Sequence, residues 1–148
     1  FHARFSAVSK TYEYRILNRP EPSALERHFA WHIRRPLDRP AMAECLADIT
    51  GRHDFAAFMA TGSSVTSTER EIYQAALEVP DADHLVFRLE ASGFLRHMVR
   101  NLVGTLVEVG KGRFNRADFL DILVAGDRRR AGMTAPARGL YLVSVRYE

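Results

Sequence analysis

The sequence has little cysteine and lysine and no long apolar run. Its single cysteine, Cys45, excludes an internal disulfide and lies in an apolar helical pattern, which is typical of a buried thiol. No apolar stretch reaches the roughly 18 residues that a membrane-spanning helix needs. The first residues lack the pattern of a secretory signal peptide. We therefore expect a cytoplasmic protein without a membrane partner.

The scarcity of lysine leaves arginine as the main cation. Among 21 basic residues only Lys10 and Lys111 are lysines, and the net charge is +3. A guanidinium group pairs with phosphate through two hydrogen bonds and stacks on bases, so this bias favours a nucleic-acid partner. A GC-rich genome would produce the same bias without functional meaning, and composition does not separate the two explanations.

Length and composition predict one folded domain over residues 1–148. The chain is 47% hydrophobic and 26% charged, which is ordinary for a globular protein and excludes a disordered one. It opens on FHARFSA rather than on methionine and enters a strand-like pattern at once. We expect it to be part of a longer protein.

Alternating apolar residues predict four strands. Residues 9–17 place Tyr12, Tyr14 and Ile16 on one face. Residues 68–79 and 84–92 are joined by PDAD, which predicts an antiparallel hairpin, and residues 140–147 form the last strand. The inward faces of the hairpin are expected to carry Tyr73, Ala75, Leu77 and Val79 in its first strand and Leu85, Phe87 and Leu89 in its second.

Apolar spacing and capping residues predict three helices. The first follows Asp38 and continues to Gly51, the second covers about 94–110 and is apolar on nearly every face, and the third covers 116–125. The order of elements predicts an α+β fold with a mainly antiparallel sheet and helices packed on one face. No glycine-rich phosphate loop follows a strand, which argues against a nucleotide cofactor.

Three motifs suggest sites, and each has a simpler explanation. His28 and His32 lie four residues apart, but zinc needs three or four ligands and no second cluster completes the set. His53 and Asp54 are adjacent, so their side chains diverge, and we interpret Asp54 as a cap or turn residue. We interpret the arginine run 128–130 as a solvated basic loop. No metal site is predicted.

Arg100 stands out because it lies within the apolar helix. A buried, unpaired guanidinium costs several kcal/mol, so it requires a carboxylate or phosphate partner. The alternatives are a salt bridge within this chain or a side chain that extends to the surface. Tyr12 is equally open, either as a core residue of its strand or as a platform on which a base stacks.

Short segments along nearly the whole chain resemble the C-terminal half of the tRNA pseudouridine synthase A (TruA) family. They are FHARFSA, KTYEYRI, GRHDFAAF, TEREI, FLRHMVRNLVGTLVEVGKG and GLYLVSVRYE, in this order. The resemblance implies a pseudouridine synthase fold. It also implies an enzyme that isomerises uridine to pseudouridine in the anticodon stem-loop of tRNA, without metal or organic cofactor and usually as a homodimer.

The resemblance also implies roles for single residues. The family's nucleophile is an aspartate in a Gly-Arg-Thr-Asp-Ala-Gly-Val-His motif, which this sequence lacks, so these residues alone are expected to be inactive. Arg100 falls on the arginine that pairs with this aspartate, Tyr12 on the tyrosine that stacks on the target uracil, and Leu140 on an apolar residue of the same pocket. The positions that align with tRNA-contacting regions are Phe1, His2, Ala3, Arg4 and Phe5, and Gly62, Ser63, Ser64, Val65 and Thr66.

The second of these regions departs from the expected pattern. GSSVT lacks basic and amide side chains, so hydroxyl or backbone donors would have to hold phosphate there. The alternative function is a non-catalytic RNA-binding or dimerisation module, in the latter case with Arg100 in an internal salt bridge. If nothing in the chain pairs with Arg100, we expect its guanidinium in an open, solvated cleft rather than in a dry core.

Overall fold

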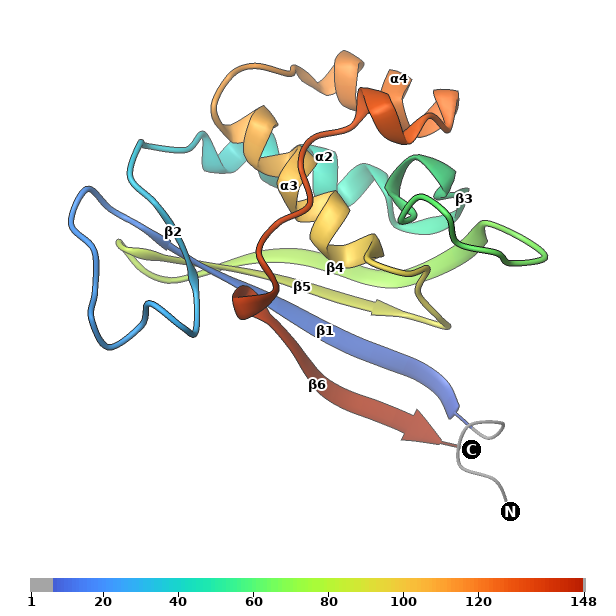
Figure 1. The fold of residues 1–148 in the computed structure, drawn as a ribbon, viewed down its shortest axis with the longest axis horizontal. Helices are drawn as coiled ribbons and strands as arrows, with labels where there is room; N and C mark the ends of the chain where they lie inside the picture. Colours follow the sequence, from blue (N-terminus) through green and yellow to red (C-terminus); the bar gives the residue numbers. More distant parts are fainter. Residues whose placement is uncertain (1–6, 148) are drawn as a thin grey trace.

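The sheet of this protein is six-stranded and is built around its first strand (Figure 1). The structure is a computed structural model that describes residues 7–147. Strand β1 (Ala7–Asn18) pairs antiparallel with β5 (His84–Ala91) on one side. On the other side it pairs antiparallel with β6 (Leu140–Tyr147) and parallel with the short β2 (Trp31–Ile33). Beyond β5 lie β4 (Glu69–Asp81) and β3 (Gly51–Asp54).

In the described part of the chain, three α-helices cover one face of this sheet (Figure 1). They are α2 (Arg39–Asp48), α3 (Met98–Gly110) and α4 (Arg116–Ala125). The sheet is antiparallel except where β1 meets β2, so the predicted α+β fold is confirmed. Among the described residues, no helix is long and apolar enough to cross a membrane.

The capping residues act as the sequence predicts. The Asp38 carboxylate accepts a hydrogen bond from the Ala41 amide at 3.1 Å and begins α2. Asn115 and Asp118 form a reciprocal capping box at the start of α4, where each side chain accepts from the other's backbone amide. Each cap satisfies amides that the first turn of a helix leaves unpaired.

The second helix begins four residues later than predicted. Phe94 and Leu95 lie in a loop, and His97 adopts the left-handed conformation with φ of 60°, which cannot continue into a right-handed helix. The helix therefore begins at Met98. Arg100 consequently lies in its first turn rather than in its middle, half-buried between the buried residues Val99 and Asn101.

The predicted inward face of the first hairpin strand is wrong at its two ends. An irregularity in the pairing between Ile72 and Gln74 turns Ile72 into the core and leaves Tyr73 43% exposed. Val79 is also exposed, close to the hairpin turn. The second strand agrees with the prediction, because Leu85, Phe87 and Leu89 are fully buried.

Helix α3 is approached very closely by the segment 132–135, which precedes β6. A Cβ atom placed on Gly104 would lie 1.6 Å from the Met133 carbonyl oxygen, so backbone packs on backbone at this point. The Gly132 amide donates to the Thr105 hydroxyl at 3.0 Å, and the Ala135 amide donates to the Arg100 carbonyl at 3.0 Å. This packing holds the segment 132–135 along the first half of α3.

Replacing Gly104 with alanine should therefore destabilise the fold. Alanine favours a helix over glycine by about 1 kcal/mol, but the added methyl group would displace a backbone carbonyl, and overpacking of this kind costs roughly 1–3 kcal/mol or more. We expect chemical denaturation to show a lower free energy of unfolding for Gly104→Ala.

Gly93→Ala is the matched control. The added Cβ would come no closer than 3.9 Å to the Arg70 side chain, which is ordinary van der Waals contact. Its stability should stay near that of the unsubstituted chain. A Gly104→Ala variant as stable as this control would show that the segment 132–135 is not held against α3.

Candidate active site

A pocket of about 310 Å³ opens between the sheet and the start of α3. The structure brings together here the three residues that the sequence resemblance singles out: Tyr12 from β1, Arg100 from α3 and Leu140 from β6. The other lining residues come from the loop before α3, from the first residues of α3 and from the turn before β6. They are Phe94, Leu95, Arg96, His97, Met98, Val99 and Ala137.

Tyr12 contributes an aromatic wall to the pocket. Its ring is half-buried and meets the Phe94 ring edge to face, with centroids 5.0 Å apart and an interplanar angle of 88°. Its backbone is fixed at the centre of the sheet, between Leu89 of β5 and Leu142 of β6. A ring held in this way offers aromatic surface to a planar group without a large cost in conformational entropy.

Arg100 contributes a positive charge that no carboxylate of the described residues neutralises. Its side chain is half-buried, and its Nε donates to the Ala135 carbonyl at 2.8 Å. None of the ion pairs within residues 7–147 includes it. The internal salt bridge considered from the sequence is therefore not formed among these residues. The expectation of a cleft rather than a dry core agrees with this geometry.

The electrostatic environment of the pocket is positive. Desolvation and the neighbouring charges of Arg100 and Arg96 lower the pKa of the His97 imidazole. The N-terminus of α3 adds the positive end of a helix dipole. Neither aspartate nor glutamate is among the described residues that line the pocket. The arrangement therefore favours an anion beside Arg100.

The position of Leu140 depends on Tyr14, which the sequence pattern places on the same face of its strand as Tyr12 and Ile16. Tyr14 is fully buried, and its hydroxyl donates to the Pro136 carbonyl at 2.5 Å. A Cβ on Gly139 would lie 2.6 Å from the Tyr14 ring, so only glycine allows the chain to pass this close. Burial raises the pKa of the Tyr14 hydroxyl well above its ordinary value, which keeps it a donor.

Asn101 organises the other side of the site and was not assigned a role from the sequence. It is fully buried, and its Nδ2 donates to the Phe58 carbonyl at 2.8 Å. Its Oδ1 accepts from the Thr134 hydroxyl at 2.6 Å and from Arg128 Nη2 at 3.0 Å. The sequence does contain a signal for this role. Asn101 is an amide inside an apolar helix, and a buried amide needs hydrogen-bond partners from other segments.

The interpretation of the arginine run 128–130 as solvated needs a correction at its first residue. Arg129 and Arg130 are exposed, and Arg129 pairs with Asp127 at 3.0 Å. Arg128 is half-buried instead, because Asn101 and the neighbouring loop supply acceptors for its guanidinium. Local sequence could not show this, since one acceptor lies 27 positions away on α3.

The other sequence motifs have structural partners. His28 accepts from Arg27 Nε at 3.2 Å, whereas His32 is hydrogen-bonded to the Arg19 carbonyl at 2.8 Å. Asp54 ends strand β3, and its carboxylate accepts from the Ala56 amide at 3.0 Å, which confirms its interpretation as a turn residue.

The predicted tRNA-contacting positions lie partly outside the described residues. Phe1, His2, Ala3, Arg4 and Phe5 belong to the segment that the structure does not describe. Gly62, Ser63, Ser64, Val65 and Thr66 lie in a loop between η1 (Ala56–Phe58) and β4. The Ala60 amide, before this loop, donates to the Arg96 carbonyl at 2.9 Å. The Ser63 hydroxyl donates to the Ala60 carbonyl at 2.7 Å, so it serves the loop itself. The tRNA contacts of these positions stay a prediction.

Comparison with known proteins shows which family the chain belongs to. The family model described as tRNA pseudouridine synthase matches residues 46–148. The chain is 46% identical to tRNA pseudouridine synthase A of Thermoanaerobacter sp. (strain X514) over 147 residues, which cover 99% of this chain and 60% of that protein. It is 46% identical to the protein of the same name from Syntrophotalea carbinolica over 148 residues, which cover 99% of this chain and 58% of that protein.

A third relative, tRNA pseudouridine synthase A of Moorella thermoacetica, is 46% identical over 147 residues, 99% of this chain and 59% of its own length. The chain thus spans somewhat less than two thirds of the relatives that it matches. The matched residues include Arg100, Leu140 and the whole of α3. With a family model over most of the chain and relatives at this identity over nearly all of it, the chain belongs to the tRNA pseudouridine synthase family.

Proposed function

We propose that these residues form one wall of the active site of a tRNA pseudouridine synthase that isomerises uridine in the anticodon stem-loop. The observation that carries the proposal is the pocket in which Tyr12, Arg100 and Leu140 meet. In this proposal the target uracil enters the pocket, stacks on Tyr12 and packs against Leu140. Aromatic stacking suits a pyrimidine because every base presents a π face.

The proposed reaction needs no cofactor because its atoms balance within the nucleoside. The glycosidic bond between N1 and C1′ breaks, a bond between C5 and C1′ forms, the C5 hydrogen leaves as a proton, and N1 gains a proton. What the reaction requires is a nucleophile for C1′ and a positive group that orients it. Arg100 is suited to the second task.

Arg100 can hold a carboxylate from outside the described residues. Its Nε is occupied by the Ala135 carbonyl, which fixes the plane of the guanidinium and leaves the terminal nitrogens for a partner. Since no described aspartate or glutamate lines the pocket, we propose that the nucleophilic aspartate lies outside these 148 residues, which alone are inactive. The resemblance to the family further supports a homodimer that acts in the cytoplasm.

Reconstitution tests this proposal. The chain would be fused to the part of the Thermoanaerobacter relative that it does not match, and release of tritium from tRNA labelled at C5 of uridine would be measured. The fusion should turn over, and the 148-residue chain should not, because only the fusion contains the aspartate. Turnover by the chain alone would place the nucleophile within it. An inactive but folded fusion that binds tRNA would favour the non-catalytic module.

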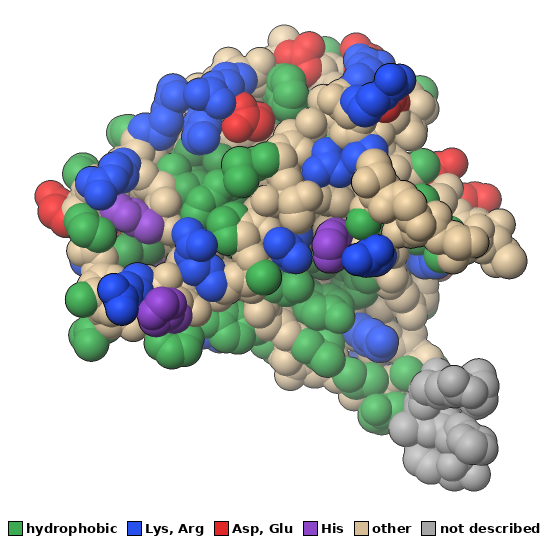
Figure 2. Space-filling view, in the orientation of Figure 1, with side chains coloured by type: hydrophobic (Ala, Val, Ile, Leu, Met, Phe, Trp, Pro, Cys, Tyr) green, Lys and Arg blue, Asp and Glu red, His purple; other side chains and the backbone are tan. Residues whose placement is uncertain are grey.

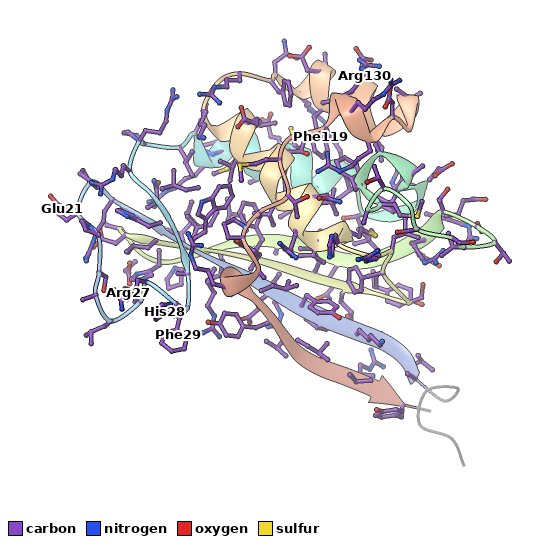
Figure 3. The ribbon with its side chains drawn as sticks, viewed as in Figure 1. Glu21, Arg27, His28, Phe29, Phe119 and Arg130 are labelled. Atoms are coloured by element: carbon purple, nitrogen blue, oxygen red, sulfur yellow. The ribbon has the colours of Figure 1, made fainter. Side chains whose placement is uncertain are left out.

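Arg100→Leu in this fusion should impair catalysis more than tRNA affinity. Loss of an oriented charge at a reaction centre lowers kcat by roughly 100-fold or more, whereas no phosphate contact is lost. Single-turnover tritium release and filter binding would separate the two effects. Arg27→Leu, an exposed residue on a distant loop (Figure 3), is the matched control and should change neither. An Arg100→Leu variant that keeps its rate and loses only affinity would contradict the assignment.

Substitutions of Tyr12 should separate stacking from chemistry. Tyr12→Phe keeps the ring and should keep most of the activity, while Tyr12→Ala should lose the stacking contribution of about 1–3 kcal/mol, or roughly 5- to 150-fold in kcat/KM. The same tritium assay measures both. Equal losses for the two variants would show that the hydroxyl, and not the ring, carries the function.

A further inference from the structure

A second pocket, of about 390 Å³, adjoins the candidate active site. It is lined by Ala60, Thr61, Arg96, His97, Arg128 and Thr134. Arg96 and His97 also line the first pocket, so the two cavities share a wall at the start of α3. A group bound in one of them would lie directly beside a group bound in the other.

The second pocket is basic and its charges are not neutralised within the described residues. Three of its six lining residues are arginine or histidine, and none is acidic. None of the ion pairs within residues 7–147 includes Arg96, His97 or Arg128. Figure 2 shows basic and histidine side chains gathered over the start of α3 with no acidic side chain among them.

Asp127, the acidic residue next to Arg128 in sequence, is engaged elsewhere. Its carboxylate accepts from Arg129 Nε at 3.1 Å and from Arg129 Nη2 at 3.0 Å. It also accepts from the Arg129 amide at 3.0 Å. The pairing with Arg129 leaves the guanidinium of Arg128 without this counter-charge.

Arg128 is held in place by neutral acceptors. Its Nη1 donates to the Gly132 carbonyl at 2.8 Å, and its Nη2 donates to Asn101 Oδ1 at 3.0 Å and to the Thr134 hydroxyl at 3.1 Å. Partial burial lowers the pKa of Arg128, although arginine stays charged in proteins. These bonds orient the guanidinium and leave its positive charge available, which is the arrangement of a preorganised anion site.

We propose that Arg96, His97 and Arg128 form a subsite for one backbone phosphate of the RNA strand that carries the target uridine. This inference rests on the proposed function, because a nucleotide in the first pocket carries its phosphates on the ribose, and these must leave the pocket across an adjoining surface. Arg128 supplies a fixed charge, Arg96 a mobile one, and His97 a ring N–H. The subsite compensates for the absence of basic residues in the loop 62–66.

The subsite predicts a coupling between Arg96 and a single phosphate. Arg96 is the suitable residue to change because it is exposed and its side chain enters no ion pair within residues 7–147, so Arg96→Gln should leave the fold intact. The probe is an anticodon stem-loop RNA and a set of copies that each carry one neutral methylphosphonate near the target uridine. Binding to the 148-residue chain would be measured by fluorescence anisotropy.

One methylphosphonate should weaken binding to the unsubstituted chain by about tenfold and weaken binding to Arg96→Gln clearly less, because the Arg96 contact is already lost in this variant while those of Arg128 and His97 remain. The slope of log K against the logarithm of the salt concentration should also become less negative by about 0.7–1 for Arg96→Gln. Arg96→Lys should restore part of the affinity. Arg27→Gln, which removes an equal charge from a distant exposed loop (Figure 3), should show no coupling to any phosphate.

Additive losses at every phosphate, or a loss for Arg27→Gln equal to that for Arg96→Gln, would overturn the subsite. A chain that binds no stem-loop RNA at any salt concentration would overturn it as well. The test is independent of turnover. Coupling without tritium release by the fusion contradicts the proposed reaction alone, whereas tritium release without coupling contradicts the subsite alone.

Discussion

The close approach of the segment 132–135 to α3 decides where the side chains of the candidate site lie. At Gly104 the helix has no side chain, and the Met133 carbonyl occupies the space where a Cβ would stand. The contact brings the Ala135 carbonyl to the Nε of Arg100, 35 positions away in sequence. Arg100 thus belongs to α3, whereas the orientation of its guanidinium is set by the segment 132–135. The same segment continues through Pro136 to Leu140, which is why one packing contact places two walls of the pocket.

Polar residues on α3 fall into two groups with different consequences. Asn101 and Thr105 are fully buried, and both are hydrogen-bonded to neighbouring segments, so they fix those segments at little net cost. Within residues 7–147, the guanidinium groups of Arg100 and Arg128 are hydrogen-bonded to neutral acceptors and to no carboxylate. The positive end of the helix dipole lies at the same place. The start of α3 is therefore a region that an anion stabilises, which fits a carboxylate in one pocket and a phosphate in the other.

Much of the fold could be predicted because it depends on local patterns. Period-two alternation located β1 and β5, and the caps at Asp38 and Asn115 located two helices to within a residue or two. The errors occur where non-local pairing overrides the pattern. The start of α3 was misplaced because apolar spacing continues through His97, whose left-handed backbone ends it. The short strands β2 and β3 carry too few residues for any periodicity, and they exist because β1 and β4 offer them free edges.

The sequence by itself determined the family and the fold class, and it singled out Tyr12, Arg100 and Leu140 as candidate site residues, because a motif consists of residue types in a fixed order along the chain. Only the tertiary structure decided that these three residues line one pocket, that Arg100 lies in the first turn of its helix, and that Arg128 belongs to the same positive region rather than to a solvated loop. The physical reason is that burial and charge compensation depend on partners far along the chain, here on the backbone of the segment 132–135. That backbone can come so close only because position 104 is glycine.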